Sequence, residues 1–452
     1  MRNTCFSRFR LLFECCLVLS FLISVGGGIG NAEAFNGLPH VELPALAGTY
    51  GVGTVVLPLV DAARLEDMTP EPDDYREIMV QVWYPIEKQR WGRTVPYLDL
   101  PSLSYMVMES IALFMPSGPQ TGTPPSATLE YPMRGDEFSH LTALAPRHTF
   151  PEEDLPGRAN RGNGAPIPLK PGRLFDIPMS THAIYSAPPA AAAGPFPVLI
   201  FSPGFGAIYS EYQSFFENIV SRGYVVAAIN HPYTSGITVS PDGRMALGRD
   251  VSSFGELDER HRVLVDDIEF LAAGIESLLL QKLGLALNMN KIGFFGHSIG
   301  GSAAVEACLE WPQCKGAINM DGSLRGQNYT RSIDKPIFLM LGEYHTFEID
   351  STLELAWRNM TRNGFMMHLD GAGHLAFMDL KLILSQIVPP AYLENLVDPF
   401  GTINGQRAVQ IAREYIIAFF DVYLKGAPVE EITSKDYPEA VLETTSDIVV
   451  DY

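Results

Sequence analysis

From residue 196 onward the chain alternates between short apolar runs and longer amphipathic segments. The apolar runs, which predict strands, lie at 196–204, 224–230, 291–296, 315–320, 335–341 and 364–369. Apolar residues recur at helical spacing in 210–223, 257–283 and 406–426, with Ser210 as the expected N-cap of the first of these helices and Gly223 at its end. Such alternation predicts an α/β fold in which helices flank a mostly parallel central sheet.

Two further strand-like runs precede this region, at 49–58 and 76–86, and we expect them to form the antiparallel edge of the same sheet. The chain that follows them is different, because 18 of the 34 prolines fall between Pro96 and Pro197. This density of proline disfavours regular structure, so residues 100–178 are predicted to form a Pro-rich insertion or lid. Within it, the stretch 103–115 is apolar enough to form a short helix.

The first 34 residues have the layout of a secretory signal peptide. Arginines precede an apolar run of about 15 residues, and small residues ending in NAEA follow, which is typical of a cleavage site. The run is short for a membrane span, although a retained signal anchor is the alternative. The sequence therefore predicts a secreted protein with one domain at 35–452, no transmembrane span in the mature chain, and an acidic surface tail at 427–452.

Composition and charge limit the kinds of molecule that the protein can bind. Hydrophobic residues make up 46% of the chain and charged residues 19%, as in ordinary globular domains. A formal charge of −20 repels nucleic acid and anionic lipid surfaces, so we expect no nucleic-acid partner. Peripheral contact with a lipid interface would depend on apolar segments such as 103–115 or 380–393, and packing of these segments on the core is the alternative.

Cys308 and Cys314 are the two cysteines outside the predicted signal. Six residues apart in an oxidising compartment, they predict one short disulfide, with two buried free thiols as the alternative. Asn328 and Asn359 each begin an Asn-X-Thr sequon and are therefore predicted glycosylation sites of a secreted chain.

The motif Gly-His-Ser-Ile-Gly, with Ser298 at its centre, follows a predicted strand and precedes a predicted helix. A nucleophile elbow needs this junction, because glycines admit a strained turn that holds the serine hydroxyl above the sheet edge. The N-terminal N–H groups of the following helix also favour a developing oxyanion. We therefore predict that Ser298 is a nucleophile, against the alternative of a serine in a tight turn.

A serine nucleophile needs a histidine base and an acid that orients it, in the chain order serine, acid, histidine. His374 follows the last predicted strand and is the predicted base, whereas His297, His345 and His368 are expected to point away, pack or lie on the surface. Asp321, just past the strand after the elbow, is the favoured acid because a strand end holds a carboxylate rigidly. The other candidates are Glu343, Glu348 and Asp350, which follow the next strand.

Oxyanion donors are expected from two backbone N–H groups. One belongs to Ile299, directly after the nucleophile, and the second to Phe205 in the glycine-containing loop 203–207, which could otherwise be a plain turn. Phosphate-loop, metal-ligand and dinucleotide motifs are not found in the sequence, so no cofactor is expected.

The motifs FSPGFGA, GHSIGG, MDGSL and GAGHLAF, together with QVWYP, resemble the secreted, plasma-type platelet-activating factor acetylhydrolase family of α/β-hydrolases. The resemblance covers roughly residues 75–98 and 180–425, and it implies the triad Ser298, Asp321 and His374 with backbone donors at Phe205 and Ile299. The sequence departs from the family at SPGFGA, where the animal enzymes have a histidine before the glycine, and in the Pro-rich segment.

The resemblance implies a calcium-independent serine esterase that hydrolyses short or oxidised sn-2 acyl esters of phospholipids. A general carboxylesterase or polyester hydrolase, which shares little beyond the elbow, is the second hypothesis. An inactive hydrolase fold used for binding is the third, and loss of a triad residue would be its signature.

Overall fold

The computed structural model describes most of the chain after residue 40. The described residues are 41–69, 71, 73–88, 94–98, 102, 179–190, 193–387 and 400–445. The predicted signal, the apolar stretch 103–115 and all of the predicted insertion except residue 102 lie outside them, and so do residues 388–393 of the segment 380–393. The predictions made for these parts of the chain therefore stay predictions.

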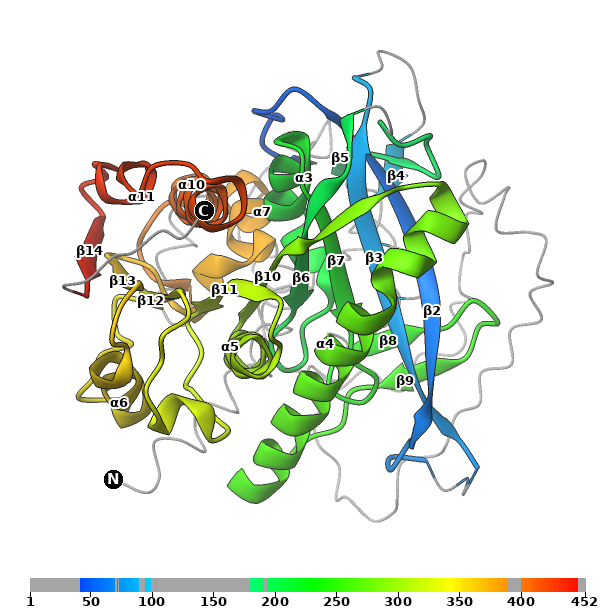
Figure 1. Ribbon diagram of the computed structural model, residues 1–452, viewed down its shortest axis with the longest axis horizontal. Helices are drawn as coiled ribbons and strands as arrows, with labels where there is room; N and C mark the ends of the chain where they lie inside the picture. Colours follow the sequence, from blue (N-terminus) through cyan, green and yellow to red (C-terminus); the bar gives the residue numbers. More distant parts are fainter. Residues whose placement is uncertain are drawn as a thin grey trace, which may run out of the picture.

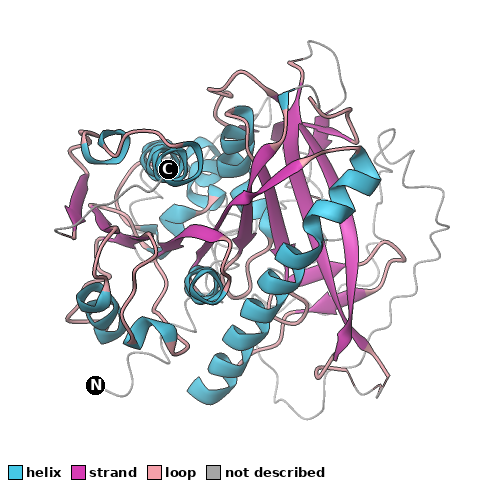
Figure 2. Cartoon of the chain, in the orientation of Figure 1, coloured by secondary structure: helices cyan, strands magenta, loops and turns pink. Residues whose placement is uncertain are grey.

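A 12-stranded sheet runs through the molecule, with helices on both of its faces (Figure 1, Figure 2). Its order is β1-β5-β2-β3-β7-β6-β10-β11-β12-β13-β14, and β4 pairs with β5 beside this path. The strands are β1 (Val41–Glu42), β2 (Gly51–Leu65), β3 (Tyr75–Ile86), β4 (Thr94–Pro96), β5 (Met179–Tyr185), β6 (Phe196–Ser202), β7 (Val225–Asn230), β10 (Leu287–His297), β11 (Cys314–Met320), β12 (Ile337–Gly342), β13 (Gly364–Leu369) and β14 (Ala440–Thr444). From β7 to β13 every neighbouring pair in this order is parallel, which confirms the predicted α/β architecture.

The helices divide between the two faces of the sheet. One face carries α3 (Gln213–Ser221), α7 (Asp379–Ile387) and α10 (Gly405–Lys425), whereas the other carries α4 (Phe254–Leu283), α5 (Ile299–Glu310) and α6 (Ser351–Asn359). Shorter elements are the 3₁₀ helices η6 (Tyr209–Tyr212), η7 (Asn328–Thr330) and η8 (His374–Phe377), the helix α11 (Glu430–Thr433), and the separate hairpin of β8 (Ile237–Val239) and β9 (Met245–Leu247).

The period-2 alternation of strand side chains creates two hydrophobic cores, one under each helical layer. In β10, for example, Phe295 packs in the core beneath α3 and α10, and Phe294 packs in the core beneath α4 and α5. Both rings are fully buried. Strands that are apolar on both faces need two covering layers, which explains why these sequence runs are continuously hydrophobic.

Local signals at the helix ends agree with the boundaries in part. In α4, Ser253 accepts from the backbone N–H of Glu256, and Gly284 ends the helix at φ 63°. The predicted cap at Ser210 is wrong, because residues 209–212 form η6 and α3 begins only at Gln213. A carboxylate oxygen of Glu211 accepts from the backbone N–H of Ile208 at 2.9 Å, so this acidic side chain holds the entry to η6 instead.

The N-terminal and C-terminal edges of the sheet differ from the prediction. β2 and β3 pair antiparallel as expected, but β5 and β1 continue the sheet beyond β2, so the pair is not its edge. β5 lies inside the Pro-rich region, where little core structure was expected, and Ala183 within it is fully buried. In the described part of the tail, residues 427–445, all residues except Ile432 are partly or fully exposed, and β14 adds an antiparallel strand to β13.

Three smaller predictions have structural outcomes. Leu380, Leu382 and Leu384 of α7 are buried in the core, so the described half of 380–393 packs inward. None of the helices in the described ranges is long and apolar enough to cross a membrane.

The Asn359 amide nitrogen donates to the Tyr329 carbonyl oxygen at 2.9 Å. Glycosylation of Asn359, like that of Asn328, stays a prediction.

A disulfide joins Cys308, near the end of α5, to Cys314, at the start of β11. It closes a loop of only a few residues at the turn that carries the chain from the elbow helix into the next strand.

We predict that the free energy of unfolding of the double variant Cys308→Ala, Cys314→Ala is about 2 kcal/mol lower than that of wild type. The effect is modest because closing so short a loop costs little entropy. Urea denaturation under non-reducing conditions measures the difference. Dithiothreitol should lower the stability of wild type by the same amount and leave the variant unchanged. Equal stability of reduced and oxidised wild type would contradict the prediction.

Candidate active site

Ser298 occupies a sharp turn between β10, which ends at His297, and α5, which begins at Ile299. Its backbone has φ 57° and ψ −129°, a conformation that is unfavourable for a residue with a side chain. The backbone N–H of Ser298 donates to the Met320 carbonyl oxygen at 2.8 Å, which ties the turn to the end of β11. Ser298 is half-buried, whereas the residues on either side of it are buried, and it lies at the carboxyl edge of the parallel strands.

Gly296 and Gly300, on either side of Ser298, are needed for close packing of the backbone. They do not themselves adopt the unfavourable positive φ. A Cβ atom on Gly296 would lie 2.4 Å from the Gly300 carbonyl oxygen, and a Cβ on Gly300 would lie 2.2 Å from the Pro203 carbonyl oxygen. Neither glycine has positive φ, since the unfavourable φ falls on Ser298. The elbow helix therefore packs directly on the loop after β6, which is possible only without side chains at these two positions.

Asp321 and His374 are in direct contact. Asp321 follows the last residue of β11 and, like Ser298, has a positive φ, of 56°. Its Oδ2 lies 2.6 Å from Nδ1 of His374, at the start of η8. The ring of His374 lies beside that of His297, with 4.6 Å between the centroids, so it stands next to the elbow. The structure thus brings two of the predicted triad residues together beside the third.

The alternative acids have other partners in the described structure. Glu343 accepts from the backbone N–H of Gly371 at 2.9 Å, and Glu348 is exposed. Asp350 caps α6, where its Oδ1 accepts from the backbone N–H of Thr352. Among the described carboxylates, only Asp321 is hydrogen-bonded to His374.

His345 is the residue of this site that the sequence did not reveal. Its Nδ1 lies 3.0 Å from Oδ1 of Asp321, and its Nε2 lies 2.9 Å from Oδ2 of Asp350. Burial by itself lowers the pKa of the His345 imidazole, but the two carboxylates together raise it to about 10. His345 is therefore a cation at neutral pH, and both of its ring nitrogens donate.

The same contacts set the charge of Asp321. Burial by itself raises the pKa of this carboxyl, but the His345 cation and the hydrogen bonds from both histidines lower it well below the usual range. The backbone N–H of Gly342 adds a third donor, 2.8 Å from Oδ1. Asp321 is consequently a fixed anion, oriented by groups on β12, on the loop that follows β12, and on η8.

His297 connects the two loops that flank the elbow. Its Nε2 donates to the His374 carbonyl oxygen at 2.9 Å, and its Nδ1 accepts from the Tyr212 hydroxyl at 2.9 Å. The Tyr212 oxygen in turn lies 3.4 Å from the backbone nitrogen of Gly204. Burial lowers the pKa of His297 to about 3, so the ring is neutral and the direction of these bonds is defined.

The loop after β6, which contains the predicted donor Phe205, approaches the elbow closely. A Cβ on Gly204 would lie 3.2 Å from the Cβ atom of Ser298. Gly206, at φ 76°, donates its N–H to the Thr234 carbonyl oxygen at 2.9 Å, which fixes the far end of the loop. Phe205 lies between these two glycines, and Ile299 begins α5, so both predicted backbone donors belong to segments next to Ser298.

The described part of the chain shows no hydrogen bond from the Ser298 hydroxyl to His374. Hydrogen bonds between a nucleophile and its base are often long or poorly aligned in enzymes without ligand and tighten when substrate binds.

A second Ser-His-Asp chain lies inside the protein. Ser202 Oγ is 2.9 Å from Nε2 of His231, whose Nδ1 is 2.9 Å from Oδ2 of Asp267. All three side chains are at most 1% exposed. Asp267 also binds Arg76 and Arg64 through its two carboxylate oxygens. No substrate ester can reach Ser202, and the chain instead anchors the last residue of β6, directly before the loop 203–207.

With this geometry established, comparison with known proteins identifies the family. The family model "Platelet-activating factor acetylhydrolase, isoform II" matches residues 177–241 and 267–429, slightly more than half of the chain. The chain belongs to this family. Ser298, Asp321, His374 and Phe205 all lie within the matched ranges.

Relatives of the acetylhydrolase family show moderate similarity. A probable 1-alkyl-2-acetylglycerophosphocholine esterase of Arthroderma benhamiae is 28% identical over 264 residues, which is 54% of this chain and 65% of that protein. A platelet-activating factor acetylhydrolase of Cavia porcellus is 23% identical over 257 residues, covering 51% and 58%. The match thus spans less than two thirds of the length of these curated relatives.

Among solved structures, a ferulic acid esterase from Streptomyces cinnamoneus superposes with a TM-score of 0.65 at 24% identity, over 89% of this chain and 99% of that one. At this identity the likeness concerns the fold alone, and it supports the α/β-hydrolase architecture of this acetylhydrolase family member.

The His345 cation predicts a pH-dependent contribution to stability. Because its folded pKa of about 10 exceeds the unfolded value of about 6.5, the contribution is complete below pH 6.5 and is lost as the pH rises toward 10. His345→Gln should therefore cost about 3 kcal/mol of unfolding free energy at pH 6 and much less at pH 10, as measured by urea denaturation. Arg358→Gln, at an exposed ion pair on α6, is the control and should show no such trend. A cost for His345→Gln that does not change with pH would contradict the assignment.

The packing of the elbow predicts that Gly300→Ala removes activity and destabilises the protein by roughly 3 kcal/mol, because its Cβ would overlap the Pro203 and Ser202 carbonyl oxygens. The control is Gly274→Ala within α4, where no atom outside the adjacent helix backbone lies within 4 Å of the new Cβ. That variant should keep full activity and gain up to about 1 kcal/mol from the helix propensity of alanine. Thermal unfolding and ester turnover test both variants, and a stable, active Gly300→Ala protein would disprove the close-packing explanation.

Proposed function

We propose that this protein is a serine carboxylic-ester hydrolase that uses Ser298, His374 and Asp321 as its catalytic triad. The observation that carries the proposal is the 2.6 Å contact between Asp321 Oδ2 and His374 Nδ1 beside the strained turn at Ser298. Family membership and the esterase names of its relatives support the same reaction class.

In the proposed mechanism the Ser298 hydroxyl attacks the ester carbonyl carbon while Nε2 of His374 takes its proton. Asp321 accepts from Nδ1, which fixes the tautomer that leaves Nε2 free to act as a base, and stabilises the imidazolium that forms. The backbone N–H groups of Ile299 and Phe205 stabilise the oxyanion. His374 then protonates the leaving alcohol, and water hydrolyses the acyl-enzyme through the same base. No cofactor takes part in these steps.

His345 and Asp350 are positioning residues in this scheme. They do not contact the substrate, but they fix Oδ1 of Asp321 while Oδ2 faces His374. A carboxylate held from both sides cannot rotate, so the imidazole of His374 keeps its orientation through the catalytic cycle.

The proposed substrates are phospholipids with a short or oxidised acyl chain at the sn-2 position, in keeping with the names of the relatives. The reaction is proposed to be independent of calcium. A general carboxylesterase or polyester hydrolase with the same triad is the alternative. We also propose that the protein is secreted, which the Cys308–Cys314 disulfide supports because such bonds persist in oxidising compartments.

The test is hydrolysis of a phosphatidylcholine with an sn-2 acetyl or butyryl chain in the presence of EDTA, alongside p-nitrophenyl butyrate. Ser298→Ala and Asp321→Asn should each lower kcat by about 10⁴-fold for both esters. Ser202→Ala is the matched control, because it removes a serine hydroxyl from the buried chain. We expect it to lower stability by about 1 to 3 kcal/mol and to retain turnover within tenfold of wild type at temperatures where it is folded.

The outcomes separate the hypotheses. Phospholipid turnover in EDTA that is lost in both triad variants supports the complete proposal. Turnover of the aryl ester alone keeps the triad and shifts the function to a general carboxylesterase. Activity that survives Ser298→Ala, or disappears only in Ser202→Ala, would disprove the proposed nucleophile.

A further inference from the structure

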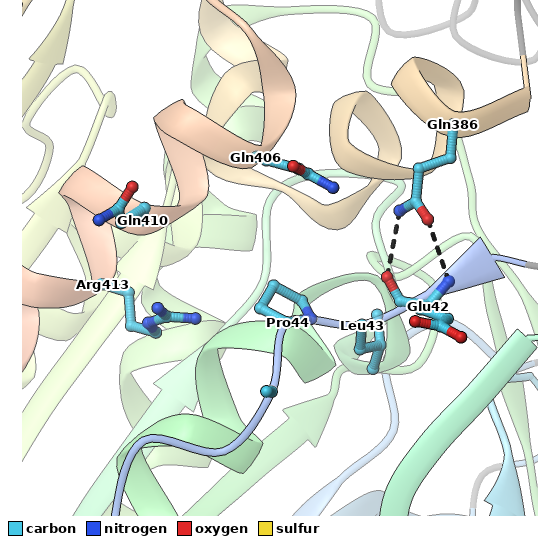
Figure 3. A pocket seen from close by; sticks show the side chains of 8 residues that line it. Glu42, Leu43, Pro44, Gln386, Gln406, Gln410 and Arg413 are labelled. Atoms are coloured by element: carbon cyan, nitrogen blue, oxygen red, sulfur yellow. Dashed lines mark hydrogen bonds between the residues drawn. The ribbon is translucent and has the colours of Figure 1, made fainter.

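A cavity of about 470 Å³ opens between the N-terminal edge of the sheet and α10, and the proposed mechanism does not use it. Its walls come from β1 and the segment 43–45, from Gln386 of α7, and from Gln406, Gln410 and Arg413 of α10 (Figure 3). The Gln386 amide is hydrogen-bonded in both directions to the backbone of Glu42, at 3.0 and 3.1 Å, which joins α7 to β1 and fixes this wall.

Arg413 is the unusual member of this cavity. Its side chain is 7% exposed, and neither Nε nor Nη1 has a hydrogen-bond partner among the described residues. Figure 3 shows the guanidinium extending from α10 across the cavity toward Pro44. A buried guanidinium without a counter-ion costs several kcal/mol, so proteins rarely retain one that has no partner. Burial also lowers the pKa of this guanidinium, as expected for a cation that lacks compensation.

The two carboxylates whose charges act on Arg413, Glu414 and Asp379, are bonded to other groups. Glu414 faces Arg222 and Lys435, at 3.6 and 3.9 Å. Asp379 accepts from the Tyr97 hydroxyl and from the backbone and hydroxyl of Ser214. Both contribute only at a distance to the potential at Arg413. The charge of Arg413 is therefore available to an anion that enters the cavity.

The lining favours one class of anion. Arg413 supplies a single positive charge, while Glu42 lies on the rim, so a dianion is disfavoured relative to a monoanion. A guanidinium matches the planar geometry of a carboxylate, and the exposed amides of Gln406 and Gln410 add neutral polar groups beside it. Leu43, Pro44 and Ala45 form an apolar wall opposite α10 that suits a short hydrocarbon stem. We propose that this cavity binds a small monocarboxylate, with Arg413 as its counter-ion.

The test measures the melting temperature of the whole protein in sodium butyrate, sodium phosphate or sodium chloride at one ionic strength and pH. Butyrate at about 100-fold its dissociation constant should raise Tm by about 3 °C over chloride, because a ligand that binds only the folded state stabilises it. Arg413→Gln should lose this shift. Arg407→Gln, which removes the same charge from the same helix outside the cavity, should keep it. Arg407 pairs with Glu439 at 2.8 Å.

A second variant places the carboxylate in the protein itself. Gln410 lies one helical turn before Arg413, so Gln410→Glu would supply a permanent counter-ion at i, i+3 spacing. It should raise Tm without ligand and abolish the response to butyrate. This arm remains informative even if Arg413→Gln does not fold.

Three outcomes would overturn the proposal. A butyrate shift that persists in Arg413→Gln would place the binding elsewhere, including at Ser298. A larger shift in phosphate than in butyrate would contradict the assignment of a monocarboxylate. Absence of any shift in wild type, with Gln410→Glu no more stable than wild type, would mean that Arg413 needs no anion.

Discussion

The charge of Asp321 is the constraint that organises the active-site edge of the sheet. A carboxylate that is 5% exposed is costly to ionise unless donors surround it, and here they come from the Gly342 backbone, His345 and His374. These donors belong to the end of β12, to the loop after it and to η8. Loss of the anion would therefore release three segments at once, and the position of His374, the proposed catalytic base, depends on a contact that also stabilises the fold.

Strained backbone is concentrated at this same edge. Ser298 and Asp321 end neighbouring parallel strands and both have positive φ, at 57° and 56°. The two residues share one anchor, since Ser298 donates to the carbonyl of Met320, the residue before Asp321. Conformations of this kind persist only where surrounding contacts outweigh their cost of about 1–3 kcal/mol each. Here the surrounding contacts are the hydrogen bonds of Asp321 and the close packing of Gly300 on Pro203.

Local sequence patterns predicted the central strands and the elbow, because neighbouring residues determine these features. Continuous apolar runs predicted β6, β7 and β10 to β13, whereas the hairpin of β8 and β9 was not predicted, and the strand-to-helix junction predicted the position of the elbow. β5 was missed because it is a short strand within a Pro-rich region, and its place in the sheet depends on pairing with β2, β1 and β4. His345 was missed for a related reason. Its partners lie 24 residues before it and 5 residues after it, so its cationic state depends on tertiary contacts that no spacing rule encodes.

The two Ser-His-Asp chains show why hydrogen bonding alone does not identify a nucleophile. Ser202 has the complete set of hydrogen bonds, yet it is fully buried and its acid is shared with two arginines. The negative charge of Asp267 is neutralised by its ion pairs with Arg76 and Arg64. Burial also lowers the pKa of His231, so its imidazole is a poor proton acceptor. The Asp321 carboxylate instead pairs with one histidine cation, His345, through Oδ1. Its Oδ2 is therefore directed at His374. The difference between the structural chain at Ser202 and the proposed catalytic triad therefore lies in burial and in the direction of the carboxylate charge, and both are properties of the assembled sheet edge.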